Sequence, residues 1–160
     1  MSNFDKCFDR LIDHEGGYTP GDNDPGGETK WGISKRSYPK LNISSLTRDD
    51  AKRIYFIDFW QRGQMDKFDF AIAFQVFDTA VNSGIETALR LLQRAVNVAD
   101  DGHIGPVTLA AIKAMSTSDV LMRFNAERLD FMRKLSAWKF FGSGWAGRIA
   151  KNLRYSAQDN

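Results

Sequence analysis

Carboxyl groups gather near the N-terminus, in a stretch that is rich in turn-forming residues. Glu15 stands directly before two glycines, and Asp22, Asp24 and Glu28 follow it closely. Two carboxyl groups that flank a cleft are the minimal equipment for hydrolysing a glycosidic bond, because one protonates the leaving oxygen while the other assists water or stabilises positive charge. These residues therefore favour glycoside hydrolysis. The alternative is that Glu15 is a surface residue at a helix end and that Asp24 begins an ordinary turn.

Glu15 is expected at the C-terminal end of a helix, which suits a general acid. The unpaired carbonyl groups of a helix end carry partial negative charge, and this charge together with desolvation would raise the pKa of a nearby carboxyl group. A carboxylic acid that keeps its proton near neutral pH can donate it in catalysis. The glycines that follow Glu15 would let a polymer backbone approach closely.

The elements that must position these groups are predicted by apolar periodicity. Apolar residues at 4, 7, 8, 11 and 12 lie on one helical face, with Ser2 or Asn3 as the cap. Residues 16–33 consist mainly of Gly, Pro, Asp and Asn, which predicts a structured loop or a small β-hairpin.

Six further helices are predicted, over about residues 47–60, 68–81, 85–96, 106–115, 118–138 and 145–153. Thr47 caps the first of them, and Gly84 in the left-handed αL conformation ends the second, which is apolar on nearly every side. Ser118 or Asp119 is expected to cap the fifth, and Gly142 and Gly144 to interrupt the chain before the last. The fold class is therefore mostly α, with at most a small β-hairpin near the catalytic loop.

Composition excludes several classes of protein. The 160 residues include one cysteine and two histidines, which argues against a disulfide framework and a metal site. No apolar run is long enough to span a membrane, and no signal peptide is visible at the N-terminus, so we expect synthesis in the cytoplasm. Residues 113–155 carry nine Lys and Arg against three acidic residues. This excess suits an anionic partner (nucleic acid, an acidic membrane face or cell wall), although solvated helix edges would explain it equally well.

Several segments together resemble glycoside hydrolase family 108, which holds phage-type N-acetylmuramidases (endolysins) and related bacterial proteins, some labelled secretion activators. The likeness covers nearly the whole chain, in order. The segments are 15–18 with 24–34, 54–60, 77–84, 92–95 with 101–108, and 144–148.

The resemblance implies a lysozyme-like helical fold that cleaves the β-1,4 bond between N-acetylmuramic acid and N-acetylglucosamine, without a cofactor or metal. Glu15 matches the catalytic glutamate of the family. Asp24 and Thr29 are similar in spacing to the second carboxylate and the threonine of phage lysozymes, and Asp22 remains an alternative to Asp24. Contacts to the sugar chain are expected from aromatic, amide and hydroxyl side chains, each of which could instead serve packing or capping. These candidates are Tyr18, Trp31, Gln75, Asn82 and Ser83.

The implied organisation is a catalytic lobe over residues 1–66 and a helical lobe over 67–160 that resembles a peptidoglycan-binding region, the two forming one compact unit. We expect a monomer that acts on peptidoglycan glycan strands in the periplasm or cell wall, as in endolysin-driven lysis, and that neither binds nucleic acid nor inserts stably into a membrane. Two alternatives stay open. One is a peptidoglycan-binding or secretion-accessory protein without catalysis, and the other is a lytic transglycosylase.

Overall fold

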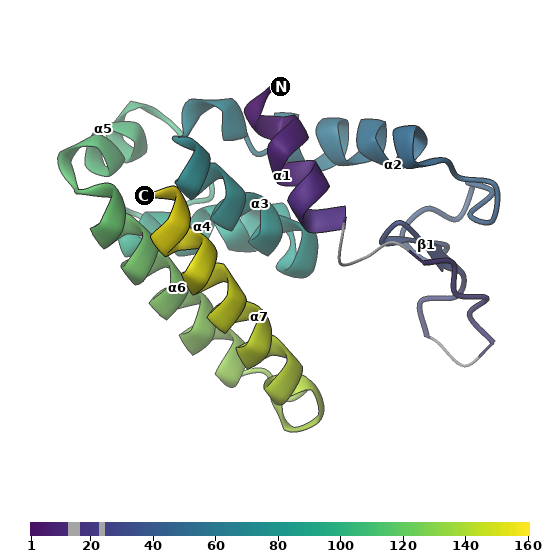
Figure 1. Cartoon of the computed structure of the whole chain (residues 1–160). Helices are drawn as coiled ribbons and strands as arrows, with labels where there is room; N and C mark the ends of the chain where they lie inside the picture. Colours follow the sequence, from purple (N-terminus) through teal and green to yellow (C-terminus); the bar gives the residue numbers. More distant parts are fainter. Residues whose placement is uncertain (13–16, 23–24) are drawn as a thin grey trace. The chain divides into compact units, whose positions relative to one another are not determined.

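The computed structural model describes residues 1–12, 17–22 and 25–160, which form two compact units (Figure 1). Unit 1 comprises Met1–Gln61 and unit 2 comprises Arg62–Asn160. The assignment of a catalytic lobe to 1–66 and a wall-binding lobe to 67–160 stays a prediction.

Unit 1 begins with the predicted amphipathic helix, α1 (Asn3–Ile12). All five apolar residues of its predicted face are buried. Ser2 caps it reciprocally: the hydroxyl group of Ser2 accepts from the amide of Asp5 at 3.1 Å, and the amide of Ser2 donates to the Asp5 carboxylate at 2.9 Å. This arrangement satisfies backbone donors that the first turn of a helix leaves unpaired.

The predicted hairpin is present as two short antiparallel strands, β1 (Thr29–Lys30) and β2 (Ile33–Ser34). The two residues that join them, Trp31 and Gly32, have φ angles of +53° and +75°. Positive φ at both central positions is the requirement of a type I′ turn, whose twist matches that of the flanking strands. An additional bridge pairs Thr19 with Thr29, so the loop folds back onto β1.

The next helix changes its geometry halfway along. Thr47, the predicted cap, forms a capping box with Asp50 at the start of α2 (Arg48–Tyr55). The chain continues as a π-helix, η1 (Phe56–Gln61). The buried side chains of this segment are Ala51, Tyr55 and Trp60, separated by four and then five residues. A π-helix pairs residues i and i+5, so Trp60 lies on the same buried face as Tyr55. In a regular α-helix, a residue five positions on would lie on a different face.

Unit 2 is built around α3 (Phe70–Ser83), which follows the short helix η2 (Met65–Lys67). Every residue from Ala71 to Ala80 is buried, as the apolar sequence predicts. Helices α4, α6 and α7 all contact α3, and α6 and α7 run side by side (Figure 1). The bounds of the remaining helices are α4 (Ile85–Ala95), α5 (Pro106–Ala114), α6 (Thr117–Arg133) and α7 (Trp138–Asp159).

Three predictions about helix ends are wrong. Gly84 has φ +94° and ψ 150°, which is not the αL conformation, and α4 begins directly after it. The cap of α6 is Ser116, whose hydroxyl accepts from the amide of Asp119 at 3.1 Å, so neither Ser118 nor Asp119 is the cap. Helix α6 also ends at Arg133, before the predicted Trp138.

The glycines expected to interrupt the last helix lie inside α7. A Cβ atom on buried Gly142 would stand 2.6 Å from the indole of Trp138, so glycine is needed there for close packing of that ring. Gly144 has no neighbour within 4 Å of such an atom. The helix tolerates its glycines because packing against the rest of unit 2 outweighs their low helix propensity.

None of the described helices is both long and apolar enough to cross a membrane.

Candidate active site

The two carboxylates that sequence predicts as catalytic, Glu15 and Asp24, lie outside the described residues. Helix α1 ends at Ile12, so the predicted helix end before Glu15 also lies outside them. The described parts of the loop, residues 17–22 and 25–34, form the frame of the candidate site.

This frame is held by backbone pairing across the loop. Thr19 and Thr29 exchange hydrogen bonds of 2.8 and 3.0 Å, and the hydroxyl group of Thr29 donates to the carbonyl of Gly27 at 3.4 Å. Gly21, at φ +83°, crosses the chain so closely that a Cβ atom would lie 2.2 Å from the carbonyl carbon of Gly27. Only glycine fits this crossing, and the crossing and the pairing together fix the backbone of Thr29.

Tyr18 and two carboxylates of the loop form a polar surface. Tyr18 is 46% exposed. Partial desolvation and the neighbouring carboxylates of Glu28 and Asp22 raise the pKa of its hydroxyl group. The structure therefore brings together one predicted sugar contact and Asp22, the alternative second carboxylate.

Trp31 has a structural role in this frame. Its indole donates to the carbonyl of Leu46 at 3.3 Å, and its own carbonyl accepts from the hydroxyl group of Tyr55 at 3.1 Å. These bonds tie the hairpin to the start and end of α2. The ring is half-buried, so only part of its surface is open to a ligand.

The predicted sugar contacts in unit 2 divide into a buried residue and a surface pair. Gln75 is 1% exposed, and its amide donates to the carbonyl of Asn152 at 3.1 Å, so it braces α3 against α7. Asn82 and Ser83, at the end of α3, line a pocket of about 190 Å³. The other lining residues are apolar or aromatic: Phe131, Met132, Leu135 and Trp145.

A buried ion cluster is linked to this pocket by Arg128, whose guanidinium donates to Oδ1 of Asn82 at 3.5 Å. Sequence analysis did not single out this cluster. Asp78 accepts from Arg128 at 2.8 Å, from Arg148 at 2.7 Å and from Asn152 at 2.7 Å. Burial alone would raise the pKa of Asp78, but the two guanidinium groups lower it to about 2. The sequence does contain one signal for this cluster, which is the acidic residue Asp78 in an otherwise apolar helix. A buried charge requires partners, so such a residue predicts cationic side chains nearby.

The turn predicted between α4 and α5 is organised by the buried side chain of Gln93. Its amide nitrogen donates to the Asp101 carboxylate at 2.9 Å and to the carbonyl of His103 at 3.0 Å, and its oxygen accepts from the amide of Gly102 at 2.8 Å. These contacts hold the turn between α4 and α5 in place. Its predicted resemblance to a peptidoglycan-binding region stays a prediction.

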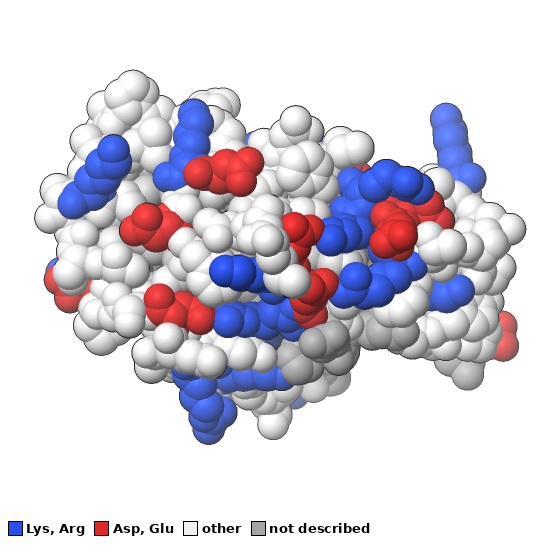
Figure 2. Space-filling model, turned by 45° about the horizontal axis from the view of Figure 1, so that its top comes forward, with Lys and Arg blue, Asp and Glu red and all other residues white. Residues whose placement is uncertain are grey.

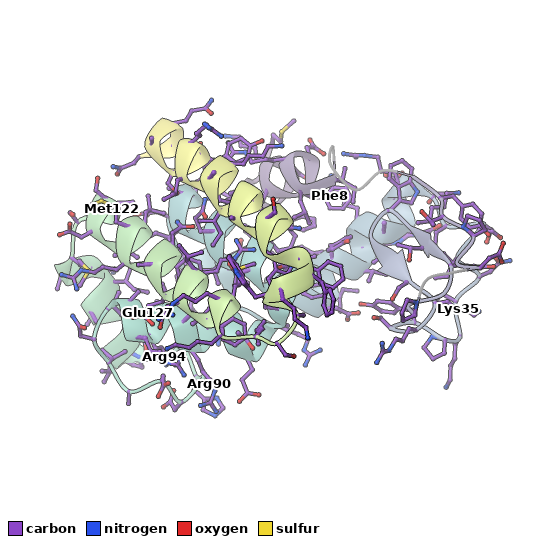
Figure 3. The ribbon with its side chains drawn as sticks, turned by 90° about the horizontal axis from the view of Figure 1, so that it is seen from below. Phe8, Lys35, Arg90, Arg94, Met122 and Glu127 are labelled. Carbon is purple, nitrogen blue, oxygen red and sulfur yellow. The ribbon has the colours of Figure 1, made fainter. Side chains whose placement is uncertain are left out.

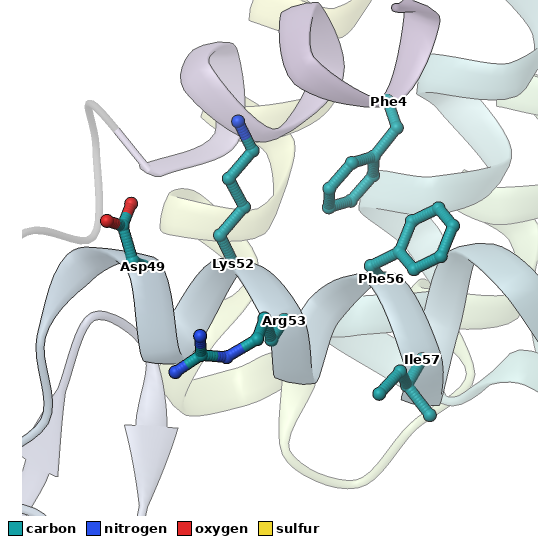
Figure 4. A pocket seen from close by; sticks show the side chains of 6 residues that line it. All are labelled: Phe4, Asp49, Lys52, Arg53, Phe56 and Ile57. Carbon is teal, nitrogen blue, oxygen red and sulfur yellow. The ribbon is translucent and has the colours of Figure 1, made fainter.

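Unit 1 also has hollows that the predicted site residues do not line. One, of about 400 Å³, lies between Phe4 of α1 and the helical segment α2–η1 (Figure 4). The rings of Phe4 and Phe56 meet there at 5.0 Å, and Lys52 pairs with Asp5 at 2.6 Å. A second, of about 470 Å³, shares Arg53 and Ile57 with the first and is bordered by Asp58.

Charges on the surface are largely interspersed. On the face shown in Figure 2, Lys and Arg side chains lie beside Asp and Glu at several places. The pair Arg48–Asp9, at 2.5 Å, and the pair Lys52–Asp5 both join α1 to α2. Such partly exposed pairs contribute little to stability. Among the described residues, no group of three or more His, Cys, Asp and Glu side chains is arranged to hold a metal ion.

Comparisons with known proteins agree with the sequence resemblance. The model of the family described as Glycosyl hydrolase 108 matches residues 8–84, a range that contains Glu15, Asp24 and Thr29. Among solved structures, the chain is similar to one titled "Structure of Brucella abortus SagA", with 29% sequence identity and a TM-score of 0.88. That match covers 98% of this chain and 94% of the other. No curated protein matches the chain at a significant level.

Residues 8–84 of the chain therefore match the glycosyl hydrolase 108 family. The protein is a glycoside hydrolase of the lysozyme type and, at the level of the family, a peptidoglycan hydrolase. The predicted mostly α, lysozyme-like fold is confirmed. The family match stops at residue 84, so it does not extend to the C-terminal region.

Proposed function

We propose that the protein is an N-acetylmuramidase, which hydrolyses the β-1,4 bond between N-acetylmuramic acid and N-acetylglucosamine. The family match over residues 8–84, which includes Glu15, carries this proposal. Glu15 acts as the general acid and protonates the glycosidic oxygen as the bond to the sugar ring breaks. The ring then develops oxocarbenium character, which a second carboxylate must offset.

Asp24 supplies this second carboxylate, and Thr29 of the same loop assists it. Thr29 supports the assignment because its backbone is fixed on one side by Thr19 and on the other by β2. A group held in this way can orient water without losing conformational entropy during the reaction. Asp22 is the competitor, and its proximity to Tyr18 makes a role in sugar binding the alternative for it.

The pocket beside Asn82 and Ser83 supplies a sugar contact in unit 2. An amide and a hydroxyl group bind sugar hydroxyls, and the adjacent ring of Trp145 offers an apolar face to a pyranose. Gln75 is not part of this proposal, because its side chain is buried and bonded to Asn152. Tyr18 and the open part of Trp31 are the corresponding aromatic surfaces of unit 1.

In the cell, the protein acts on glycan strands of the wall as a monomer, and its role is endolysin-like lysis. The proposed substrate is an anionic polymer, in keeping with the excess of Lys and Arg over residues 113–155. Nucleic acid is not the proposed partner.

The test is digestion of purified peptidoglycan by the wild-type protein and by Glu15→Gln, with products identified by mass spectrometry. Glutamine keeps the shape of the side chain and removes the proton donor. We expect reducing N-acetylmuramic acid ends from the wild type and a loss of about 10³-fold or more in Glu15→Gln. Glu86→Gln is the matched control, since it makes the same change at a glutamate that is 73% exposed on α4 and should retain most of the activity.

The products also distinguish the alternatives. Ends carrying a 1,6-anhydro ring would show a lytic transglycosylase, which uses no water. Wall binding without cleavage by folded wild-type protein would show an accessory binder. Parallel assays of Asp24→Asn and Asp22→Asn identify the second carboxylate, because only the variant that removes it should lose activity as severely as Glu15→Gln.

A further inference from the structure

The turn that joins α6 to α7, together with the first residues of α7, carries large apolar side chains exposed to solvent. We call residues 133–141 the hairpin tip. Phe140 is 74% exposed, Phe141 59% and Leu135 38%. Figure 1 shows this end of the α6–α7 pair projecting beyond α3, α4 and α5. Exposed apolar side chains gathered at one place indicate an interaction surface, whereas scattered ones do not.

The aromatic rings of the tip contact one another and are not covered by other elements of unit 2. The rings of Phe140 and Phe141 are 6.4 Å apart, and Phe141 lies 6.0 Å from Trp145. Trp145 in turn lies 6.1 Å from Trp138. Trp138 is seated against Gly142, which fixes the start of α7. The exposed rings are therefore presented from a firm base.

The same segment carries three cations. Arg133, Lys134 and Lys139 belong to the tip, and the amine of Lys139 lies 4.9 Å from the centre of the Phe140 ring. No acidic residue occurs between Phe131 and Gln158, a stretch with six Lys and Arg residues. Asp130 is the neighbouring acid, and it pairs with both Arg133 and Lys134.

We propose that the hairpin tip binds the surface of an anionic lipid bilayer. Phe140 and Phe141 enter the headgroup region, while Lys139, Arg133 and Lys134 contact lipid phosphates. Aromatic side chains prefer this interfacial zone, and each nearby Lys or Arg is attracted to an anionic leaflet. The tip lies on the surface and does not span the bilayer, because so short a turn cannot cross the hydrocarbon layer.

The chemistry of the tip favours lipid over a glycan strand. Residues 133–141 contain no Asn, Gln, Asp or Glu, so the tip lacks the amide and carboxylate groups that accept hydrogen bonds from sugar hydroxyl groups. The inference goes beyond the proposed function, because membrane contact would hold a wall hydrolase against the innermost glycan. It also stands apart from catalysis, since vesicles contain no peptidoglycan.

The test is co-sedimentation with phosphatidylglycerol vesicles and, in parallel, with phosphatidylcholine vesicles. We expect wild-type protein to bind the anionic vesicles preferentially. The double variant Phe140→Ser/Phe141→Ser should bind at least about tenfold more weakly. The matched control is Val107→Ser/Met122→Ser, which removes two apolar side chains that are 73% and 59% exposed on α5 and α6, away from the tip (Figure 3 labels Met122). The control should bind as the wild type does.

A second comparison tests the charge. Lys139→Gln should weaken binding to anionic vesicles about fivefold, while Lys113→Gln, an exposed cation on α5, should not. Thermal unfolding of each variant verifies folding, which these exposed changes should leave intact.

Three outcomes would overturn the proposal. One is that the wild type does not bind the vesicles, and another is that it binds them equally well after loss of both phenylalanines. The third is that the two phenylalanines are needed instead for self-association in sedimentation velocity, or for retention of a single-stranded oligonucleotide. Either result would assign the tip to that partner.

Discussion

Arg148 of α7 binds both carboxylate oxygens of Asp78 of α3, seventy residues earlier in the chain. Its Nη2 donates to Oδ1 at 2.7 Å and its Nε donates to Oδ2 at 3.1 Å. Arg128 of α6 donates a further hydrogen bond to Oδ2 of Asp78 at 2.8 Å. The side chain of Arg128 is 0% exposed. One carboxylate therefore joins three helices of unit 2.

Asp78→Asn should destabilise the protein by about 3–5 kcal/mol, because the buried guanidinium of Arg128 would lose its counter-charge. Denaturant unfolding monitored by circular dichroism measures this change. The control is Asp100→Asn, which breaks the surface pair with Arg94 and should cost less than about 1 kcal/mol. Equal effects of the two variants would show that the cluster contributes no more than an exposed pair.

The same carboxylate predicts a loss of stability in acid. The pKa of Asp78 is about 2 in the folded protein, compared with the ordinary value of 3.8. A lowered folded-state pKa stabilises the protein above the unfolded-state value, so roughly 2 kcal/mol should be present above about pH 4 and disappear as the pH falls towards about 2. Unfolding free energies measured across this range should fall less steeply for Asp78→Asn. An unchanged slope would contradict the assignment.

Glycine substitutions in α7 should have opposite effects at two positions. Gly142→Ala should cost about 1–3 kcal/mol, because the new methyl group would overlap the indole of Trp138. Gly147→Ala meets nothing within 4 Å and should stabilise the helix by roughly 0.5–1 kcal/mol. Thermal unfolding of both variants checks the pair, and stabilisation by Gly142→Ala would refute the packing argument.

Asn82→Ala should raise the KM for soluble glycan strands about tenfold and leave kcat close to its wild-type value, since a hydrogen bond to bound sugar would be lost. Initial rates of fragment release over a range of substrate concentrations separate the two constants. Gln158→Ala removes an exposed amide elsewhere on α7 and should change neither. If Asn82→Ala behaves in the same way, its pocket does not contact the substrate.

Much of the helical architecture could be predicted from local patterns. The buried face of α1, the capping box at Thr47, the apolar α3 and the proline at the start of α5 each follow from neighbouring residues in the sequence. The type of hairpin turn depends on positive φ at Trp31, a residue type that rarely adopts it, so the sequence indicated a hairpin without its detailed geometry.

At two places, tertiary packing overrides local propensity. Gly142 has a low helix propensity, but it lies inside α7 because the ring of Trp138 packs directly against it. The five-residue step from Tyr55 to Trp60 requires a π-turn that no propensity scale indicates. At the candidate site, Asn82 and Ser83 line a pocket. Gln75 is buried and donates a hydrogen bond to the carbonyl of Asn152, so it does not line that pocket. The residues that would have revealed the Asp78 cluster come from helices far apart in the sequence.

That separation affects the order in which unit 2 can assemble. Helices α3 and α4 are adjacent in sequence and can pair early, but Asp78 would then be a charge on an apolar surface without a partner. Its partners arrive only with α6 and α7, after long loops have closed at an entropic cost. An intermediate that contains only the α3–α4 hairpin is therefore unstable. The Asp78 cluster makes stable packing of this hairpin depend on the docking of α6 and α7.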